Sequence, residues 1–422
     1  MEENRRNQSW WNLAIVLCGA LISVPSLILG GTLVSGMSLP MALFTAFVGY
    51  AIIVVIMISQ GMQSVDQAKP AVKVAEQVFG KVGSSKVVSL ILAISALGWF
   101  GIQANVAGIA VQGILAAYSI TVPAWICSII VGIVMVLTAM YGIKFIQRLA
   151  WIAVPYLMII VLYGFWYAFA HENAAQVVAA YHPSTSISFV NGLVTTVGSF
   201  ALGAVIVGDY AQFSTKRSDI IKASILGIIP AGVVMIGIGA VLTIAFKTAD
   251  ISSLFIKIGT PFIGGLALVL ATWKVNVVNA YSGGIAVSNV FNIPEKYRKL
   301  TLFVVGVVGT LLAAIGVLNY FTPVMSVLSA MIPPVAGVMG ASYWLIHHGD
   351  ASQWQPTEGV NWLGLSAWLV GALFGGVPTV LAMIPNVWHP SANPIIGIVV
   401  ALVIYYFGSK FTHQEVPAKE EA

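Results

Sequence analysis

Long apolar runs constrain the fold of this chain more than any other feature of its sequence. Many of these runs reach about 20 residues, which at 1.5 Å per helical residue crosses the roughly 30 Å hydrocarbon core of a bilayer. Only 8% of the 422 residues are charged, whereas soluble domains carry about 25%. The runs lack the period-two alternation of a membrane β-barrel. The sequence therefore predicts an all-α membrane protein.

Short polar segments divide the apolar sequence into twelve predicted membrane spans. The first half of the chain contains predicted spans at 12–34, 40–60, 86–116, 123–143, 149–170 and 187–208. The second half contains predicted spans at 221–246, 261–285, 299–320, 324–347, 360–385 and 391–408. We expect residues 1–11 and 409–422 to form tails outside the bilayer.

The distribution of positive charge predicts the orientation of the chain. Of the 19 Lys and Arg residues, Lys274 lies inside the eighth predicted span, and only Lys247 and Lys257 lie on one side of the bilayer. The other 16, which is 19 minus three, lie on the opposite side. Because segments rich in Lys and Arg stay in the cytoplasm, we expect both termini to be cytoplasmic.

Two of the predicted spans contain residues that interrupt helices. In the first span, Pro25 predicts an opening near residues 21–25, because proline removes a backbone donor and clashes with the preceding turn. In the sixth span, Gly198 and Gly203 flank a second weak point. Such breaks at corresponding positions are typical of transporters built from inverted repeats, where the broken helices frame a site at the bilayer midplane. The alternative is that Gly and Pro are simply frequent in membrane helices.

Short strings in four of these spans resemble motifs of the nucleobase/cation symporters. They are Gly30-Gly31-Thr32 in the first span, Gly98-Trp99-Phe100-Gly101-Ile102-Gln103 in the third, Gly198-Ser199-Phe200 and Gly208-Asp209-Tyr210-Ala211-Gln212-Phe213 in the sixth, and Ile332-Pro333-Pro334-Val335-Ala336-Gly337-Val338 in the tenth. The strings follow the family order, so the resemblance covers nearly the whole chain. It is of the purine-cytosine permease type, and within that type the chain most resembles the bacterial cytosine permeases. This resemblance implies a multi-pass protein of a bacterial inner membrane.

The resemblance implies a fold with a ten-helix core of two inverted five-helix repeats, in which helices 1 and 6 are broken. It assigns residues 12–170 to the first repeat, 187–347 to the second, and 360–408 to two extra helices. It also implies a secondary transporter that imports a nucleobase-like heterocycle by alternating access, as a monomer and without a cofactor.

Aromatic and amide side chains predict where a flat heterocycle binds. Trp99 in the third span and Phe200 at the predicted break of the sixth offer stacking faces, and by resemblance they sandwich the base. Gln103 lies one turn beyond Trp99 on the same helix face, where its amide can both donate and accept. Asn276 and Asn279 form an amide pair in the eighth span, and Ser23 at the first break completes the expected substrate set. The alternative for the amides is hydrogen bonding between helices.

Two departures from the cytosine permeases leave the substrate open. Ala96 stands where those proteins place a glutamine, and Leu202 stands where they place a serine. Gln103 instead matches the glutamine of the related hydantoin transporter. The substrate is therefore open among cytosine, other pyrimidines, purines, hydantoins, allantoin and thiamine-related pyrimidines.

The resemblance also identifies a cation site that this chain has altered. In sodium-coupled members, carbonyls of the first span join hydroxyls of the eighth; the matching positions here are Gly19 and Ile22, and Lys274 and Val275. Sodium needs several oxygens, so we expect no sodium there and a proton as the coupling ion. Lys274 can act as a permanent cation that holds the two spans together, as a proton carrier, or as a side chain that reaches a water-filled vestibule. Uniport, exchange and sodium-coupled import of another heterocycle stay open.

Other functional classes fit the sequence poorly. An intramembrane enzyme needs a catalytic group such as GxSG with a facing His or paired membrane aspartates, and the spans offer neither. A channel favours a repeated pore motif, and ATP-driven transport needs a Walker sequence; neither occurs. We predict that the chain is not an enzyme and that it has no metal site and no nucleic-acid partner.

Overall fold

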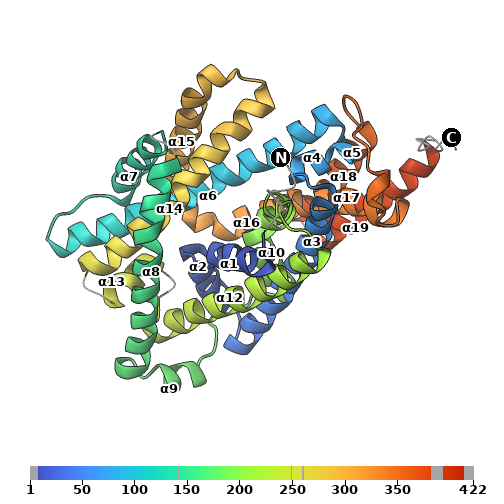
Figure 1. The fold of residues 1–422 in the computed structure, drawn as a ribbon. Coiled ribbons are helices and arrows are strands. Elements are labelled where there is room, and N and C mark those ends of the chain that lie inside the picture. The colour runs from blue at the N-terminus through green and yellow to red at the C-terminus, as the bar shows by residue number, and fades with distance from the viewer. Residues whose placement is uncertain (1–7, 141–142, 249, 259–260, 382–392, 413–422) are drawn as a thin grey trace, which may run out of the picture.

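The computed structural model describes residues 8–140, 143–248, 250–258, 261–381 and 393–412, and within these ranges it is helical without strands. The helices that make up the spans are α1 (Trp10–Leu21), α2 (Val24–Val34), α3 (Leu39–Gln67), α6 (Lys81–Ala117), α7 (Ala124–Ala139), α8 (Ile143–His171), α10 (Phe189–Val205), α12 (Arg217–Phe246), α14 (Pro261–Phe291), α15 (Arg298–Ala314), α16 (Phe321–Met331), α17 (Pro333–Gly340), α18 (Trp362–Leu381) and α19 (Pro394–Phe411). In Figure 1, α1 and α2 lie near the centre of the bundle beside α10 and α12.

Nine membrane-crossing units follow from length and composition within the described residues. Eight helical segments are long and apolar enough to cross a membrane, and α1 with α2 forms a ninth as a pair bent by 57°. Three shorter apolar helices, Ala124–Ala139, Pro155–His171 and Trp362–Gly376, coincide with the fourth, fifth and eleventh predicted spans. The all-α membrane fold is confirmed, while the count of twelve stays a prediction. Most of the predicted tails, and the ends of the last two spans that face each other, lie outside the described residues.

The sequence pattern did not predict the short helices between the spans. They are α4 (Ala71–Val74), α5 (Glu76–Phe79), α9 (Ala174–Ala179), α11 (Gly208–Ala211) and α13 (Ile251–Ile258). With four to eight residues each, they are too short to produce a clear hydrophobic period.

The predicted break of the first span is confirmed. Helix α1 ends at Leu21 and α2 begins at Val24, so Ile22 and Ser23 carry the bend. The Ser26 hydroxyl donates to the Leu21 carbonyl at 2.7 Å, which satisfies one of the carbonyl groups that the break frees. Pro25 lies in the first turn of α2, where no helical amide is needed.

The sixth span is also interrupted, but the predicted position was wrong. Helix α10 is continuous through Val205, and the interruption falls at Ile206 and Val207, before α11. Gly198 serves close packing instead: a Cβ there would lie 2.0 Å from the Met325 carbonyl oxygen of α16. Glycine in a membrane helix can mark either a break or a close helix contact, and this contact depends on a helix that is distant in sequence.

Lys86 at the start of α6 holds the end of α14. Its ammonium donates to the carbonyls of Asn289 and Val290 at 2.7 and 2.5 Å and to Asn292 Oδ1 at 2.7 Å. The last carbonyls of a helix have no partner within that helix and carry partial negative charge. Lys86 therefore ties the third and eighth spans together at one end.

Substitution of this lysine tests the tie. We expect Lys86→Met to destabilise the protein by about 1 kcal/mol, because it keeps the apolar stem and removes the charge-assisted hydrogen bonds. Thermal melting of the detergent-purified protein measures the effect. Lys222→Met is the matched control, since Lys222 has no hydrogen bond or ion pair within the described part of the chain. Equal melting temperatures for the two variants would contradict the assignment.

Candidate functional site

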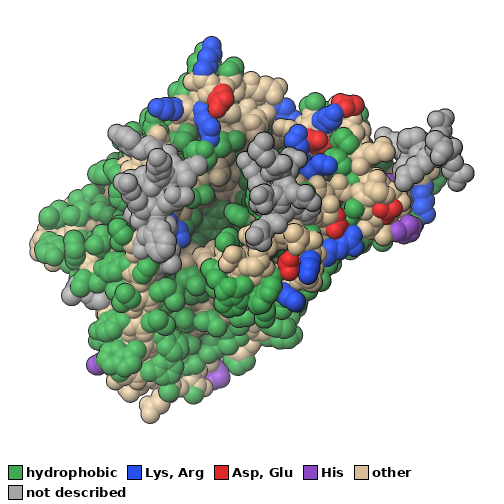
Figure 2. Space-filling view, in the orientation of Figure 1, with side chains coloured by type: hydrophobic (Ala, Val, Ile, Leu, Met, Phe, Trp, Pro, Cys, Tyr) green, Lys and Arg blue, Asp and Glu red, His purple; other side chains and the backbone are tan. Residues whose placement is uncertain are grey.

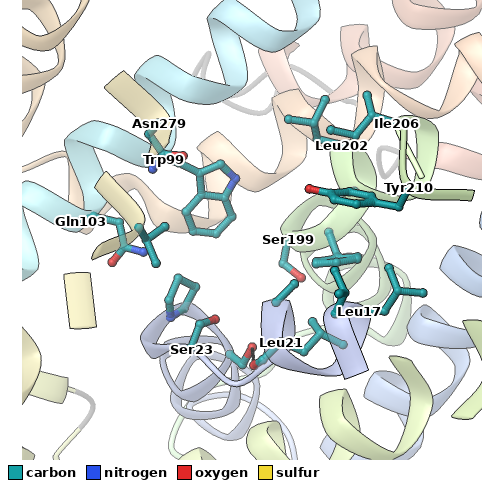
Figure 3. A pocket seen from close by; sticks show the side chains of 17 residues that line it. Leu17, Leu21, Ser23, Trp99, Gln103, Ser199, Leu202, Ile206, Tyr210 and Asn279 are labelled. Carbon is teal, nitrogen blue, oxygen red and sulfur yellow. Dashed lines mark hydrogen bonds between the residues drawn. The ribbon is translucent and has the colours of Figure 1, made fainter. Parts of the chain in front are cut away.

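A cavity of about 270 Å³ lies at the bend between α1 and α2. Its walls come from α1 and α2, from α6, from α10 and α11, and from α14, so the third, sixth and eighth spans face the break of the first. Figure 3 shows Trp99 and Gln103 on one side of the cavity and Ser199, Leu202 and Tyr210 on another. This arrangement places aromatic and polar groups around a space inside the bundle.

The cavity brings together five of the six residues predicted to bind substrate. These residues are Ser23, Trp99, Gln103, Phe200 and Asn279. They come from four helical segments that are distant in sequence, yet all five border the same space.

The two aromatic residues are half-buried and border the cavity. Trp99 extends into the cavity in Figure 3, while its ring makes a T-shaped contact with the ring of Phe321 at a centroid distance of 6.3 Å and an interplanar angle of 70°. Phe200 packs beside Gly203, where a Cβ would lie 2.7 Å from the phenyl ring. Neither Trp99 nor Phe200 stacks face to face on another ring within the described residues. Their faces can therefore receive a planar molecule.

Gln103 is the residue of the cavity wall whose side-chain amide, within the described part of the chain, lacks hydrogen-bond partners for both its nitrogen and its oxygen. The residue is fully buried, and neither atom of its amide has a hydrogen-bond partner among the described residues. A buried amide without partners costs about 1–3 kcal/mol per unmatched group. A ligand with one donor and one acceptor on the same edge can satisfy both atoms.

Asn276 does not border the cavity; it supports Asn279, which does. The Asn276 amide nitrogen donates to the Phe100 carbonyl at 3.0 Å and contacts the Met135 sulfur at 3.3 Å. Its oxygen accepts from Asn279 Nδ2 at 3.2 Å. The side-chain oxygen of Asn279 accepts no hydrogen bond from the described residues. Asn276 thus links α14 to α6 and orients its neighbour.

Three further polar residues, which the sequence did not single out as binding residues, also border the cavity. Ser26 and Ser199 use their hydroxyl hydrogens on backbone carbonyls, Leu21 and Thr196 respectively, each at 2.7 Å. Their oxygens are left as acceptors. Tyr210 borders the cavity from α11. Ser199 and Tyr210 lie within recognisable strings of the sixth span, so a signal for both was present in the sequence.

Lys274 borders a separate small void of about 10 Å³ at the same bend. Ile22 and Ser23 from the bend, Ala271 and Val275 from α14, and Ala153 and Leu157 from α8 surround it. The structure thus brings Lys274 to Ile22, as predicted for the altered cation site, whereas Gly19 is exposed and does not border this void. Within the described part of the chain, the ammonium makes no hydrogen bond or ion pair.

A bent first span whose break opens on a buried aromatic and polar cavity defines a membrane transporter of the broken-helix class. Comparison with known sequences gives the family. Residues 1–403 match the model of the permeases for cytosine/purines, uracil, thiamine and allantoin, and the chain belongs to this family. It is accordingly a multi-pass membrane permease and not an enzyme.

Individual relatives agree with this family. The chain is 27% identical over 366 residues to the cytosine permease of Escherichia coli (strain K12), covering 86% of this chain and 84% of that protein. It is 23% identical over an alignment of 456 residues to the hydantoin permease of Microbacterium maritypicum, covering 98% and 88%. Both alignments cover more than four fifths of this chain and of the relative.

Two solved structures share the fold. The inward-facing conformation of Mhp1 superposes with a TM-score of 0.80 at 21% identity, covering 96% of this chain and 91% of that one. Mhp1, a nucleobase-cation-symport-1 family transporter, also superposes in a closed conformation with bromovinylhydantoin bound, with a TM-score of 0.72 at 20% identity and coverage of 97% and 93%.

Proposed function

We propose that this permease imports a nucleobase-like heterocycle, cytosine or a related pyrimidine or purine, by secondary active transport with alternating access. It works as a monomer in a bacterial inner membrane with both termini in the cytoplasm. The excess of Lys and Arg on one side of the predicted spans supports this orientation. In Figure 2, most of the charged side chains in view gather toward one end, and hydrophobic side chains cover the other.

The observation that carries the proposal is the unpaired Gln103 amide, which borders the same cavity as the rings of Trp99 and Phe200. A planar heterocycle can stack on Trp99 and Phe200 while its ring edge bonds to Gln103 and Asn279. The hydantoin permease among the relatives supports the alternative that the substrate is another heterocycle with the same edge chemistry, such as a hydantoin, allantoin or a thiamine-related pyrimidine.

A ligand screen tests this function directly. Purified protein is melted in the presence of cytosine, uracil, purines, hydantoins, allantoin and thiamine-related pyrimidines, each with and without sodium. We expect at least one heterocycle to stabilise the protein, by about 2.7 kcal/mol at a concentration 100 times its Kd. Sodium should not change this stabilisation. A panel in which no heterocycle raises the melting temperature would contradict the proposal.

The environment of Lys274 supports proton coupling and argues against sodium coupling. An ammonium and the hydrocarbon of Val275 stand where sodium-coupled relatives are expected to supply oxygens. A lysine within a span costs roughly 2.5–3.5 kcal/mol on insertion scales, and it lowers that cost by binding near the carbonyls of the bend or by losing its proton. The void beside Lys274 is too small for a hydrated ion. It adjoins the bend between α1 and α2, which must move during alternating access. A proton that binds more tightly in one facing state would drive import.

Gln103 is expected to set substrate preference. Gln103→Ala should change the order of affinities among bases without lowering the melting temperature of the empty protein, because it removes an amide that has no partner there. Competition binding with the panel measures the order. Gln60→Ala is the matched control, since Gln60 is also buried with an unpaired amide but does not border the cavity. If every heterocycle loses affinity equally in Gln103→Ala, the residue does not set preference.

A further inference from the structure

A second, larger hollow lies on the side of the bundle away from the substrate cavity. It is an apolar groove of about 540 Å³ between α3, α17 with the π-helical turn Ala341–Ile346, and α19. Helix α17 contacts both α3 and α19, and α17 and α19 lie at the right of Figure 1. The substrate cavity shares none of the residues that line the groove.

The groove runs along the apolar, membrane-spanning part of α3. On α3 it extends from Phe47 to Ser59, and each of these residues is eight positions from the nearer end of the helix, counting 39 to 47 and 59 to 67. Twelve residues of helix rise about 18 Å, which exceeds the roughly 15 Å depth of one hydrocarbon leaflet. The groove is therefore long enough for most of a fatty acyl chain and is placed where such chains are.

The two polar side chains of the groove are hydrogen-bonded to each other, so they do not require a polar occupant. These side chains are Ser59 and Trp344, and they bond to each other, Trp344 Nε1 donating to Ser59 Oγ at 3.0 Å. The rest of the wall is hydrocarbon, with Gly337 and Gly340 exposing backbone that is already helical. A polar solute would lose its hydration here without compensation, whereas an acyl chain would not.

The groove is continuous with the surface that the membrane-spanning helices present to lipid. Val55 is 67% exposed and Phe47 is 49% exposed, and both stand at its rim. We propose that this groove holds the acyl chain of one bilayer phospholipid, which packs between α3 and the second half of the tenth span. The acyl chain fills a gap that the side chains of the described residues leave open, in a position where lipid is the solvent.

Two substitutions from opposite walls test the groove. Val48→Trp fills it from α3, and Gly340→Leu fills it from α17, where a Cβ has no neighbour nearer than Ser59 Oγ at 3.9 Å. Val234→Trp is the matched control, because Val234 is an exposed mid-span residue of α12 outside the groove. The full chain is purified in mild detergent, washed with lipid-free detergent, and weighed by native mass spectrometry.

We expect one phospholipid to remain on wild-type protein and on Val234→Trp, and the bound fraction to fall about tenfold in both groove variants, because the new side chain takes the volume that the acyl chain needs. If Val48→Trp does not fold, Gly340→Leu decides. Wild-type protein that retains no phospholipid would overturn the proposal. Equal retention by a folded groove variant and the control would overturn it as well.

Discussion

Trp99→Ala is expected to weaken heterocycle binding by roughly 1–3 kcal/mol, or about 5- to 150-fold, because each base stacked on an aromatic side chain gains that much. The indole forms one face of the cavity, and alanine leaves that face open to water. Isothermal titration with the best ligand of the heterocycle panel measures the loss. Trp99→Phe should recover most of the affinity, since a phenyl ring also stacks.

Two controls separate this loss from unfolding. Trp125→Ala removes an exposed indole of α7 that does not border the cavity, and it should bind with wild-type affinity. Empty Trp99→Ala should melt at a lower temperature than wild type but still cooperatively, because it loses the packing of a half-buried indole against the core. An unchanged affinity in Trp99→Ala would remove Trp99 from the site.

Lys274→Ala is expected to abolish the stimulation of uptake by an inward proton gradient while leaving substrate exchange intact. One pH unit corresponds to about 1.4 kcal/mol, so a gradient of that size supports roughly tenfold accumulation when one proton moves with each substrate. Wild-type proteoliposomes should therefore accumulate substrate under a proton gradient and ignore a sodium gradient. The variant should equilibrate substrate without accumulating it.

The matched control for coupling is Lys257→Ala, which removes a lysine of α13 that does not border the void at the bend. It should keep proton-driven accumulation. Uptake by wild-type protein that responds to sodium would contradict sodium independence. Accumulation that survives in Lys274→Ala would leave Lys274 as a fixed cation that holds the first and eighth spans together.

The fold was predictable where local chemistry decides it. Apolar runs predicted the spans, and Pro25 predicted the bend of the first span because its effect acts on the adjacent turn. The position of the sixth-span break was not predictable in the same way. Gly198 looks like a weak point in sequence, but its role depends on the Met325 carbonyl of another helix.

The candidate site follows the same division. Trp99 and Gln103 share one helix, so their spacing placed them on one face and the structure places both at the cavity. Asn276 and Asn279 also share a helix, yet only Asn279 borders the cavity. The Phe100 carbonyl engages the Asn276 amide across the α6 interface. The spacing of side chains in the sequence does not show where a backbone carbonyl of another helix lies, so it could not predict that Asn276 bonds to Phe100.

The close approach at Gly198 has a consequence for how the substrate range of such a permease can diversify. Phe200 lies two residues beyond a contact that has no room for even one methyl group, so any larger residue at Gly198 displaces the helix that presents the phenyl ring. The opposite wall carries Gln103 and Asn279 on side chains that can be exchanged without moving a backbone. Directed evolution toward a new base should therefore leave Gly198 unchanged and place its mutations at side chains that line the cavity, such as Gln103 and Asn279.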